Sequence, residues 1–240
     1  MSDAHPTTAT VAEEEYLQSL FWLQEAGLPM TGANVARAMQ LSAPTVHEMI
    51  GRLERDGYIT RGADRAIAFT DSGAAHAAGI VRRHRLIERF LTDVLGIPWD
   101  EVHEEAERLE HAMSPVLEER MLAAIGDAKT CPHGHPISSA DRLPGVPLAD
   151  VQVGASVRVL RFENEAEDLL RYLKASGLEP GLEGALAARD EDRVAVDTAD
   201  GRTLELTMSV AETVSVVADP SPPPRTALPE QLVIGQRYGR

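Results

Sequence analysis

The chain has few of the features that mark secreted, membrane or disulfide-bonded proteins. Its 240 residues include one cysteine, Cys131, so an intramolecular disulfide is impossible, which fits a reducing compartment. No segment reaches the roughly 18 consecutive apolar residues that a membrane-spanning helix needs. The first residues, MSDAHPTTATVAEEE, are polar and acidic and are not typical of a secretory signal. We therefore expect a cytoplasmic protein that does not enter a membrane.

The sequence also lacks the short motifs of common enzyme classes. It contains no HEXXH zinc motif, no glycine-rich phosphate loop, no G-x-S-x-G elbow and no plausible catalytic triad. We therefore do not expect an enzyme. A metallohydrolase stays open as an alternative, because such enzymes also use histidine and carboxylate ligands. Two further alternatives are a regulator that senses a small organic ligand and an interaction module that works through its C-terminal part.

Aromatic residues are scarce, at 4%, so the core has to be built from Leu, Ile, Val, Ala and Met. The net charge of −15 argues against unspecific binding of nucleic acid. Residues 31–65 are an exception, because five arginines and four acidic residues give this stretch a net charge of +1. We expect any affinity for DNA to be conditional, since divalent cations would reduce the repulsion.

The first 72 residues predict a winged helix-turn-helix. Apolar periodicity and capping residues indicate helices over about 13–26 and 31–39, a third between Ser42 and Gly57, and strands at 58–60 and 66–70. A turn over 62–65 joins the two strands. Three helices and a hairpin in this order are typical of a DNA-binding domain.

A helical block over 73–130 follows, with helices predicted from residue 71 or 72 to about 95, from 98 to 113 and from 115 to about 126. Its second helix carries an apolar stripe of Val102, Ala106, Leu109 and Met113. This stripe needs a surface to cover it, and a second subunit is the candidate.

Metal-competent side chains recur in this block at helical spacing. His84 and Glu88 are four residues apart, and His103, Glu107, Glu110 and His111 follow at steps of four, three and one. Imidazole and carboxylate are suitable ligands for divalent first-row metals. A solvated charged face is the alternative, but these residues border the apolar positions instead of opposing them. A DNA-binding domain joined to these metal-competent side chains predicts a metal sensor.

The C-terminal part predicts a linker over 131–150, a small β-barrel over 151–218 and a flexible tail over 219–240. Short strands surround one helix at 167–176, and the tail is rich in proline. The run Cys131-Pro132-His133-Gly134-His135 is either a set of ligands or a turn, and we interpret it as a turn because two prolines and one glycine explain it. The overall fold class is mainly α with a small β part.

Five stretches together resemble the diphtheria toxin repressor family of metal-dependent transcriptional repressors: EEYLQSL, SAPTVHEMIGRLERDGYI, RRHRLIERFLTDVLGI, VHEEAERLEHAMS and CPHGHPI. The resemblance covers about residues 13–218 and follows the order of the family. It implies a homodimer that binds operator DNA of metal-homeostasis genes when metal-loaded. It also implies that the C-terminal β part, with RYLKASGLEPG, is an SH3-like domain.

The resemblance implies two metal sites. One would use Glu15, Glu107, Glu110 and His111, and the other His84, Glu88 and His103. Ligands from the SH3-like domain stay open, because Glu163, Glu165 and Glu167 do not align cleanly with the family pattern. Where the iron-responsive branch has methionine and cysteine, this chain has Glu15 and Glu107, and hard oxygen ligands favour Mn²⁺. Fe²⁺ is the alternative, and Co²⁺, Zn²⁺ or Ni²⁺ can substitute in vitro.

The third helix is the predicted recognition helix, because a helix-turn-helix places its second helix in the major groove with the N-terminal residues at base edges. Arginines beyond those residues would contact phosphates and set the register. The predicted DNA contacts are Ser42, Pro44, Thr45, His47, Glu48, Arg52, Arg55 and Arg65.

Overall fold

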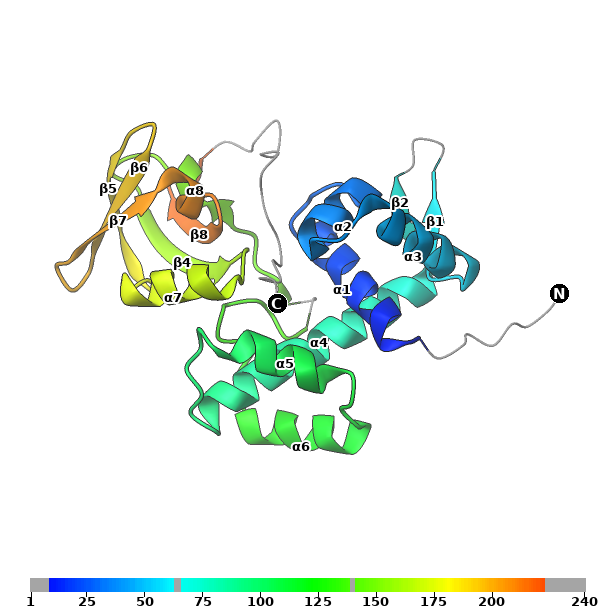
Figure 1. The fold of residues 1–240 in the computed structure, drawn as a ribbon. Coiled ribbons are helices and arrows are strands. Elements are labelled where there is room, and N and C mark those ends of the chain that lie inside the picture. The colour runs from blue at the N-terminus through cyan, green and yellow to red at the C-terminus, as the bar shows by residue number, and fades with distance from the viewer. Residues whose placement is uncertain (1–8, 63–65, 139–140, 223–240) are drawn as a thin grey trace.

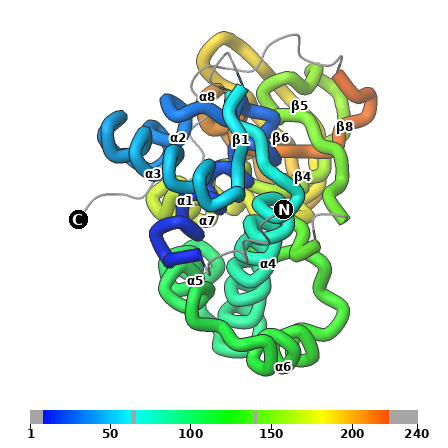
Figure 2. The backbone as a smooth tube through the Cα atoms, turned by 90° about the vertical axis from the view of Figure 1, so that its right-hand side faces the viewer, coloured from blue at the N-terminus to red at the C-terminus, as the bar shows by residue number. Residues whose placement is uncertain are grey.

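The computed structural model describes residues 9–62, 66–138 and 141–222. Figure 1 shows three units: an N-terminal unit of helices with a small hairpin, a helical middle, and a C-terminal unit built on a sheet. The long helix α4 (Asp71–Asp93) contacts α1 of the N-terminal unit as well as α5 and α6 of the middle (Figures 1 and 2). It therefore connects the first two units structurally.

The N-terminal unit has the predicted winged helix-turn-helix. It contains α1 (Val11–Glu25), α2 (Gly32–Met39), α3 (Ala43–Arg55), β1 (Ile59–Arg61) and β2 (Ile67–Phe69), with the two strands antiparallel. Thr10 and Glu13 form a capping box at the start of α1, and the Ser42 side chain caps α3 by accepting from the Thr45 N–H. Arg65, in the turn between the strands, lies outside the described residues.

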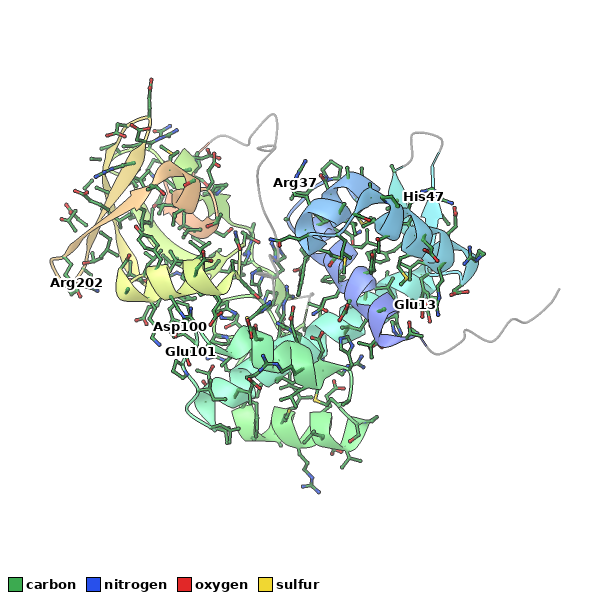
Figure 3. All side chains as sticks on the ribbon, in the orientation of Figure 1. Glu13, Arg37, His47, Asp100, Glu101 and Arg202 are labelled. Carbon is green, nitrogen blue, oxygen red and sulfur yellow. The ribbon has the colours of Figure 1, made fainter. Side chains whose placement is uncertain are left out.

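The middle unit is formed by α4, α5 (Val102–Glu110) and α6 (Pro115–Ile125). Helix α5 starts at Val102 and not at residue 98 as predicted, because the residues before it contact the sheet unit. Trp99 stacks against Phe162, and Asp100 forms an ion pair with Lys174 of α7. Figure 3 shows Asp100 and Glu101 at the point where α5 approaches α7.

The predicted apolar stripe on α5 is mostly covered within the chain. Val102 and Ala106 are fully buried in a cluster with residues of α4 and α6, and Met113 packs against the same cluster. Leu109 is 43% exposed, so it alone of the four presents a large apolar surface. The expectation that a second subunit covers the whole stripe is therefore wrong for Val102 and Ala106.

The stretch expected to be a linker contains buried residues. Cys131, His133 and His135 are 1%, 0% and 6% exposed. An isolated bridge between Thr130 and Pro136 and a hydrogen bond from the Cys131 N–H to the His135 carbonyl, at 2.8 Å, close the predicted turn. The sheet also begins inside this stretch, with β3 (Val146–Pro147), followed by a short 3-10 helix (Leu148–Asp150).

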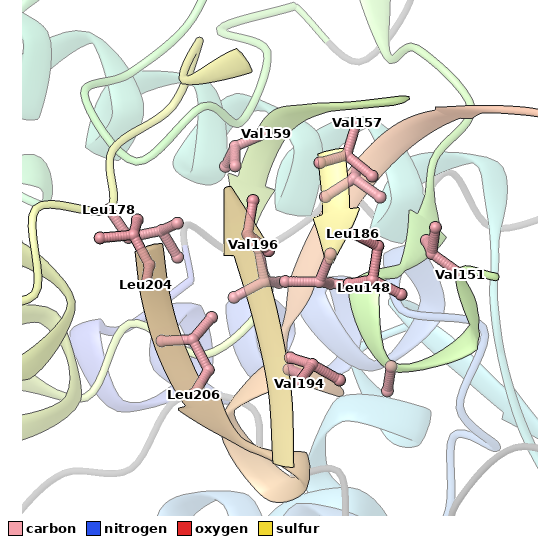
Figure 4. Packing of buried hydrophobic residues seen from close by; sticks show 14 of the residues in the cluster. Leu148, Val151, Val157, Val159, Leu178, Leu186, Val194, Val196, Leu204 and Leu206 are labelled. Carbon is pink, nitrogen blue, oxygen red and sulfur yellow. The ribbon is translucent and has the colours of Figure 1, made fainter. Parts of the chain in front are cut away.

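The C-terminal unit is a six-stranded antiparallel sheet in the order β3-β8-β4-β5-β6-β7. Its further elements are β4 (Ser156–Phe162), α7 (Glu167–Ala175), β5 (Glu183–Arg189), β6 (Arg193–Thr198), β7 (Thr203–Thr207), α8 (Met208–Ala211) and β8 (Val214–Asp219). Aliphatic side chains from these strands fill its core (Figure 4). The expected closure into a barrel is wrong, because β3 and β7 are the edges of an open sheet in the described residues.

None of the described helices is both long enough and apolar enough to cross a membrane. The predicted proline-rich tail falls largely outside the described residues, which end at residue 222, although Asp219 still belongs to β8.

Candidate metal centre and recognition helix

Three of the predicted ligands converge between α4 and α5. The Nε2 atom of His84 lies 3.0 Å from Oε1 of Glu88 and 3.1 Å from Nδ1 of His103. Glu165, from the loop after β4, places Oε2 3.1 Å from the same His103 nitrogen. One ligand atom from each of these four residues lies within 4.8 Å of the other three. The structure thus selects Glu165 among the three glutamates that the sequence left open.

A second group of ligand atoms shares two of these residues. It consists of Glu88, Cys131, His133 and Glu165, again within 4.8 Å of one another. Nδ1 of His133 lies 3.3 Å from Oε1 of Glu88 and 3.5 Å from Oε1 of Glu165. We refer to His84, Glu88, His103, Cys131, His133 and Glu165 together as the buried cluster.

A backbone contact orients the His133 ring toward the buried cluster. Its Nε2 atom lies 2.7 Å from the carbonyl oxygen of Trp99, and because a carbonyl only accepts, Nε2 carries the hydrogen. In the neutral ring the lone pair is then on Nδ1, which faces Glu88 and Glu165. Such second contacts fix the tautomer and ring orientation of ligating histidines.

The residues of the buried cluster fit a divalent metal ion. Oε2 of Glu88 and Nδ1 of His133 have no hydrogen-bond partner among the described residues, although both side chains are 0% exposed. Buried polar atoms normally have partners, so these two point to a bound group. Imidazole nitrogen, carboxylate oxygen and one thiol suit divalent first-row metals. The interpretation of these residues as a solvated face is excluded by their burial.

Charges in the buried cluster stabilise one another. Burial opposes a charge on His103, but hydrogen bonds to Glu165 and Glu88 raise its pKa to about 9. Burial also opposes ionisation of Glu88, yet His133 and His84 beside it hold the pKa of this carboxyl well below its usual range. Burial and the neighbouring Glu88 raise the pKa of the Cys131 thiol to about 11. Metal binding would therefore have to displace protons from the cluster.

Of the residues predicted for the first metal site, the structure brings Glu110 and His111 into contact. At the contact between α1 and α5, Nδ1 of His111 lies 2.6 Å from Oε2 of Glu14, and Nε2 of His111 lies 3.2 Å from Oε1 of Glu110. We call Glu14, Glu110 and His111 the α1–α5 junction. Oε1 of Glu14 also lies 3.1 Å from Nε2 of His76.

Among the described residues, Glu15 and Glu107 join neither of the two groups of ligand atoms within 4.8 Å, and the junction residues do not form a further group of three. Oε1 of Glu107 lies 3.7 Å from Nε2 of His103, so this side chain leans toward the buried cluster. The negative charge of Glu15 is among the causes that raise the pKa of His111, after its hydrogen bond to Glu14. Both residues therefore stay predicted ligands of the junction, and Glu14 is the α1 carboxylate that contacts His111.

Glu110 connects the junction to the buried cluster. Its Oε2 atom lies 2.6 Å from Nδ1 of His84 and accepts a hydrogen bond from Nε2 of Gln18, at 3.1 Å. Its Oε1 atom faces His111. One buried carboxylate thus contacts a histidine of each centre, and Gln18 of α1 fixes its orientation.

Sequence reasoning missed Glu14, Gln18, Cys131, His133 and Glu165 as members of these centres. A signal existed for Cys131 and His133, because the CPHGH run was considered as a set of ligands before we interpreted it as a turn. The run forms a turn, as interpreted, and the same turn brings Cys131 and His133 into the second group of ligand atoms, so their role as ligands stays a prediction. No local pattern distinguishes Glu165 from its neighbours.

A charged network beside the cluster holds the three units together. Arg85 of α4 forms an ion pair with Glu25 at the end of α1. Arg142 lies 3.5 Å from the same carboxylate and 3.3 Å from Glu163, which follows β4. The adjoining pocket opens between the units and is lined by Trp22, Glu25, Ala26, Arg85, His103, His135, Glu163 and Glu165. It gives the buried cluster a path to solvent.

The exposed side of α3 carries the predicted DNA contacts at its N-terminal end. Ser42, Pro44, Thr45, His47 and Glu48 are all exposed, and Figure 3 shows His47 on the outer side of the N-terminal unit. Arg52, also exposed, places Nε 2.7 Å from Oε1 of the buried Glu13, so part of its charge is used within the protein. Arg55, one turn further, is exposed at the end of the helix.

A winged helix-turn-helix, a helical unit with buried metal ligands and an SH3-like unit define a metal-dependent DNA-binding regulator. Family descriptions match all three parts: "Iron dependent repressor, N-terminal DNA binding domain" matches residues 8–67, "Iron dependent repressor, metal binding and dimerisation domain" matches 70–139, and "FeoA domain" matches 146–218.

Individual proteins agree with this assignment. The iron-dependent repressor IdeR of Mycobacterium tuberculosis is 33% identical over 219 residues, which cover 85% of this chain and 91% of that protein. The diphtheria toxin repressor of Corynebacterium diphtheriae is 31% identical over 218 residues, covering 85% of this chain and 95% of that protein. A solved manganese-dependent transcriptional repressor in complex with manganese is 35% identical, with a TM-score of 0.78 and coverage of 86% and 99%. The chain belongs to the diphtheria toxin repressor family of metal-dependent transcriptional repressors.

Proposed function

We propose that this chain is a manganese-responsive repressor that binds operator DNA of metal-homeostasis genes as a homodimer, in the cytoplasm and without catalytic activity. The observation that carries the proposal is the α1–α5 junction, where Glu14 of the DNA-binding unit contacts His111 beside the dimerisation helices. The working division is a DNA-binding domain over 1–72, a metal-binding and dimerisation domain over 73–130, a linker over 131–150, an SH3-like domain over 151–218 and a tail.

The junction supports a switch because its residues belong to both units. Glu14 and Glu15 lie on α1, whereas Glu107, Glu110 and His111 lie on or next to α5. The carboxylates repel one another when nothing positive lies between them. A divalent cation would supply that positive charge. With the repulsion removed, α1 stays against α5, and the recognition helices of two subunits keep the spacing that successive major grooves require.

The donor sets favour different metals at the two centres. The carboxylates of Glu14 and Glu110, with those of Glu15 and Glu107 as predicted ligands, would give the junction mainly hard oxygen ligands, which favours Mn²⁺ there. The thiol of Cys131 makes the buried cluster suitable for softer ions as well. We therefore keep Fe²⁺ as the alternative signal, consistent with the 33% identity to an iron-dependent repressor.

DNA binding under defined metal conditions tests the proposal. The probes are the duplex upstream of the chain's own gene and those upstream of metal-uptake genes, at fixed salt, with a scrambled duplex as control. We expect binding with Mn²⁺, or with Fe²⁺ under anaerobic conditions, and none with a chelator. The lower of the two half-maximal metal concentrations identifies the signal. Equal binding in the chelator would overturn the switch, and turnover of phosphoesters or peptides by the metal-loaded protein would restore the metallohydrolase alternative.

A further inference from the structure

Glu13 lies in the first turn of α1 and uses both of its carboxylate oxygens. The residue is buried, with 2% of its surface exposed. Oε2 accepts two hydrogen bonds from Thr10, one from the backbone N–H at 2.7 Å and one from the hydroxyl at 2.8 Å. Oε1 has no hydrogen-bond partner among the described residues, but it lies 2.7 Å from Nε of Arg52 in α3. One oxygen therefore caps α1, and the other faces the recognition helix.

The capping box does not explain why Glu13 is charged. A glutamine at the same position of a helix also completes a capping box. Burial opposes ionisation of Glu13, but the hydrogen bonds from Thr10 and the nearby charge of Arg52 hold its pKa below 4.5. A buried charge is costly unless an opposite charge compensates it. Arg52 supplies that opposite charge, so the ion pair is a second role of Glu13.

Arg52 lies on the side of α3 that carries the predicted DNA contacts. Thr45, Glu48 and Arg52 follow one another at steps of three and four residues, and all three are exposed. The Arg52 side chain is 45% exposed, although Glu13 lies against its Nε. Because the pair uses Nε, it leaves the two terminal amino groups of the guanidinium for another acceptor. A phosphate group matches the planar arrangement of these donors.

The ion pair also restrains Arg52 before any DNA is bound. A long side chain that becomes ordered only on binding reduces the affinity, because its rotamer freedom is lost at that step. Glu13 is itself held by α1 and by its two hydrogen bonds to Thr10. Asp56, at 3.8 Å from the same Nε and 30% exposed, is the more distant acidic neighbour. The restraint on Arg52 therefore comes mainly from α1 and not from its own helix.

We propose that Glu13 is a positioning residue for DNA binding, which orients Arg52 so that its terminal guanidinium nitrogens contact one phosphate of the operator backbone. The contact fixes the register of α3 on the duplex and carries no base preference. This inference rests on the proposed DNA-binding function, and it makes a contact of the recognition helix depend on a residue of another helix.

DNA binding by the full chain at saturating Mn²⁺ tests the inference, with the duplex upstream of its own gene and a scrambled duplex as probes. Arg52→Ala should reduce the slope of log affinity against log salt by about 1, the effect of one lost phosphate contact. Glu13→Gln keeps the capping box and removes the charge. It should weaken binding to both duplexes by the same factor, roughly 2- to 10-fold, which corresponds to ordering one long side chain.

The direction of the Glu13→Gln effect is decisive. Removing a negative charge from the protein would by itself strengthen binding to the DNA polyanion, whereas loss of the restraint on Arg52 weakens it. Unchanged or tighter binding would overturn the inference, and tighter binding would mean that Glu13 withholds Arg52 from DNA. An unchanged salt slope in Arg52→Ala would also overturn it, because Arg52 would then contact no phosphate.

Two controls separate positioning from a damaged helix. Thr10→Ala removes the other side chain of the capping box and leaves the pair of Glu13 with Arg52, so it should reduce stability without the loss of DNA affinity. Glu14, the next residue, contacts His111, so a disrupted first turn of α1 would also weaken Mn²⁺ binding to the free protein. Glu13→Gln should leave Mn²⁺ affinity unchanged, and a joint loss of Mn²⁺ and DNA affinity would overturn the inference in favour of a structural role.

A double-mutant cycle completes the test. In an Arg52→Ala background, Glu13→Gln should no longer weaken DNA binding, because the side chain that Glu13 orients is absent. The same factor of loss in both backgrounds would show that Glu13 acts without Arg52 and would contradict the inference. Equal DNA binding in Mn²⁺ and in a chelator would overturn the proposed metal switch but not the role of Glu13, since every comparison is made at one metal concentration.

Discussion

Gly134 sets the position of the histidines in the buried cluster. Its φ of 92° lies in the left-handed region that favours glycine. A Cβ atom there would lie 1.9 Å from the carbonyl oxygen of Leu160 in β4, closer than any real contact. The absence of a side chain therefore lets the turn pack directly against the sheet. This packing brings His133 and His135, the residues on either side of Gly134, close to Glu165.

We expect Gly134→Ala to displace this turn from β4 and to weaken metal binding in the buried cluster by roughly 10-fold or more, the range seen when groups that orient ligands are changed. Gly154→Ala is the matched control, because its φ of 89° is similar but a Cβ atom there meets nothing within 4 Å. Cobalt titrations followed by absorption compare the two variants. Equal affinities would show that backbone strain, and not the contact with Leu160, decides the outcome.

Glu14 gives a second prediction at the scale of single residues. Its carboxylate lies 2.6 Å from Nδ1 of His111 and is the contact between α1 and the metal-binding unit. We expect Glu14→Gln to raise the Mn²⁺ concentration for half-maximal DNA binding by roughly 10-fold, whether Glu14 ligates the ion or orients His111. Glu104→Gln, at an exposed position of α5 paired with Arg108, should leave that concentration unchanged. An unchanged value for Glu14→Gln would mean that this contact plays no part in the switch.

Individual ligands were predictable from the sequence only where helical spacing defines a neighbour. His84 and Glu88 lie on one turn of α4, and their contact at 3.0 Å is the i,i+4 relation that the sequence showed. Glu165 and His133 could not be found this way, because they reach Glu88 through the packing of a turn against a different unit. Glu15 came from the resemblance and stays a predicted ligand; spacing alone does not decide which carboxylate of α1 contacts His111, since the rotation of α1 toward α5 depends on tertiary contacts.

At the scale of elements, α1 carries a buried or nearly buried carboxylate at each end. Glu13 pairs with Arg52 of α3 near the start, and Glu25 pairs with Arg85 of α4 at the end. Burial works against ionisation of Glu25, but the hydrogen bond from Arg85 and the nearby charges lower its pKa below 4.5. A carboxyl group whose pKa is lower in the folded state stabilises the fold at higher pH.

The contribution of Glu25 to stability should therefore be complete above pH 4.5. It should disappear as the pH falls through the lower pKa that Glu25 has in the folded state. At neutral pH we expect Glu25→Gln to reduce the free energy of unfolding by roughly 1.5–3 kcal/mol, the range for hydrogen bonds to charged groups. Urea unfolding of both proteins between neutral and acidic pH measures the difference, with exposed Glu179→Gln as control. A difference that persists unchanged in acid would assign the stability to packing instead of charge.

The end of α3 yields a prediction about DNA. Arg55 is exposed at the end of the recognition helix, whereas Arg52 already pairs with Glu13. We expect Arg55→Ala to weaken binding to all duplexes alike and to reduce the slope of log affinity against log salt by about 1, the effect of one lost phosphate contact. Arg171→Ala, at an exposed position of α7, should leave the slope unchanged. A change in sequence preference for Arg55→Ala would indicate a base contact instead.

Most elements were predictable because local signals decide them. The caps at Thr31 and Ser42 and the apolar periodicity of the first three helices match the structure closely. Helix α5 is the exception, since Trp99 packs on Phe162 and draws residues 98–101 out of the helix. The small residues of β5, in GALAA, give only a weak alternating pattern, so this strand has little local signal in the sequence. Closure of the sheet depends on how far the strands coil, which no local pattern encodes.

On the scale of the whole molecule, the SH3-like unit contributes the carboxylate of Glu165 to a cluster formed mainly by the helical unit. A chain that ends at residue 145 lacks Glu165, so it should lose high-affinity binding in the buried cluster and keep the α1–α5 junction. We expect this truncated chain to retain metal-dependent DNA binding with a higher Mn²⁺ requirement. Glu165→Ala in the full chain separates loss of the ligand from loss of the unit. Complete loss of DNA binding in the truncated chain alone would make the SH3-like unit essential to recognition, whereas complete loss in both proteins would make the Glu165 carboxylate essential.

Glu110 has a consequence for how the protein responds to metal supply. Its two carboxylate oxygens face His84 and His111, so a change in charge at one centre alters the environment of the other. If both centres bind metal as proposed, thermodynamic reciprocity requires that filling the junction changes the affinity of the buried cluster by the same factor as filling the cluster changes that of the junction. The occupancy of the protein would then not be the product of two independent binding curves. We expect the metal concentration that half-fills either centre to depend on the state of the other through this single side chain.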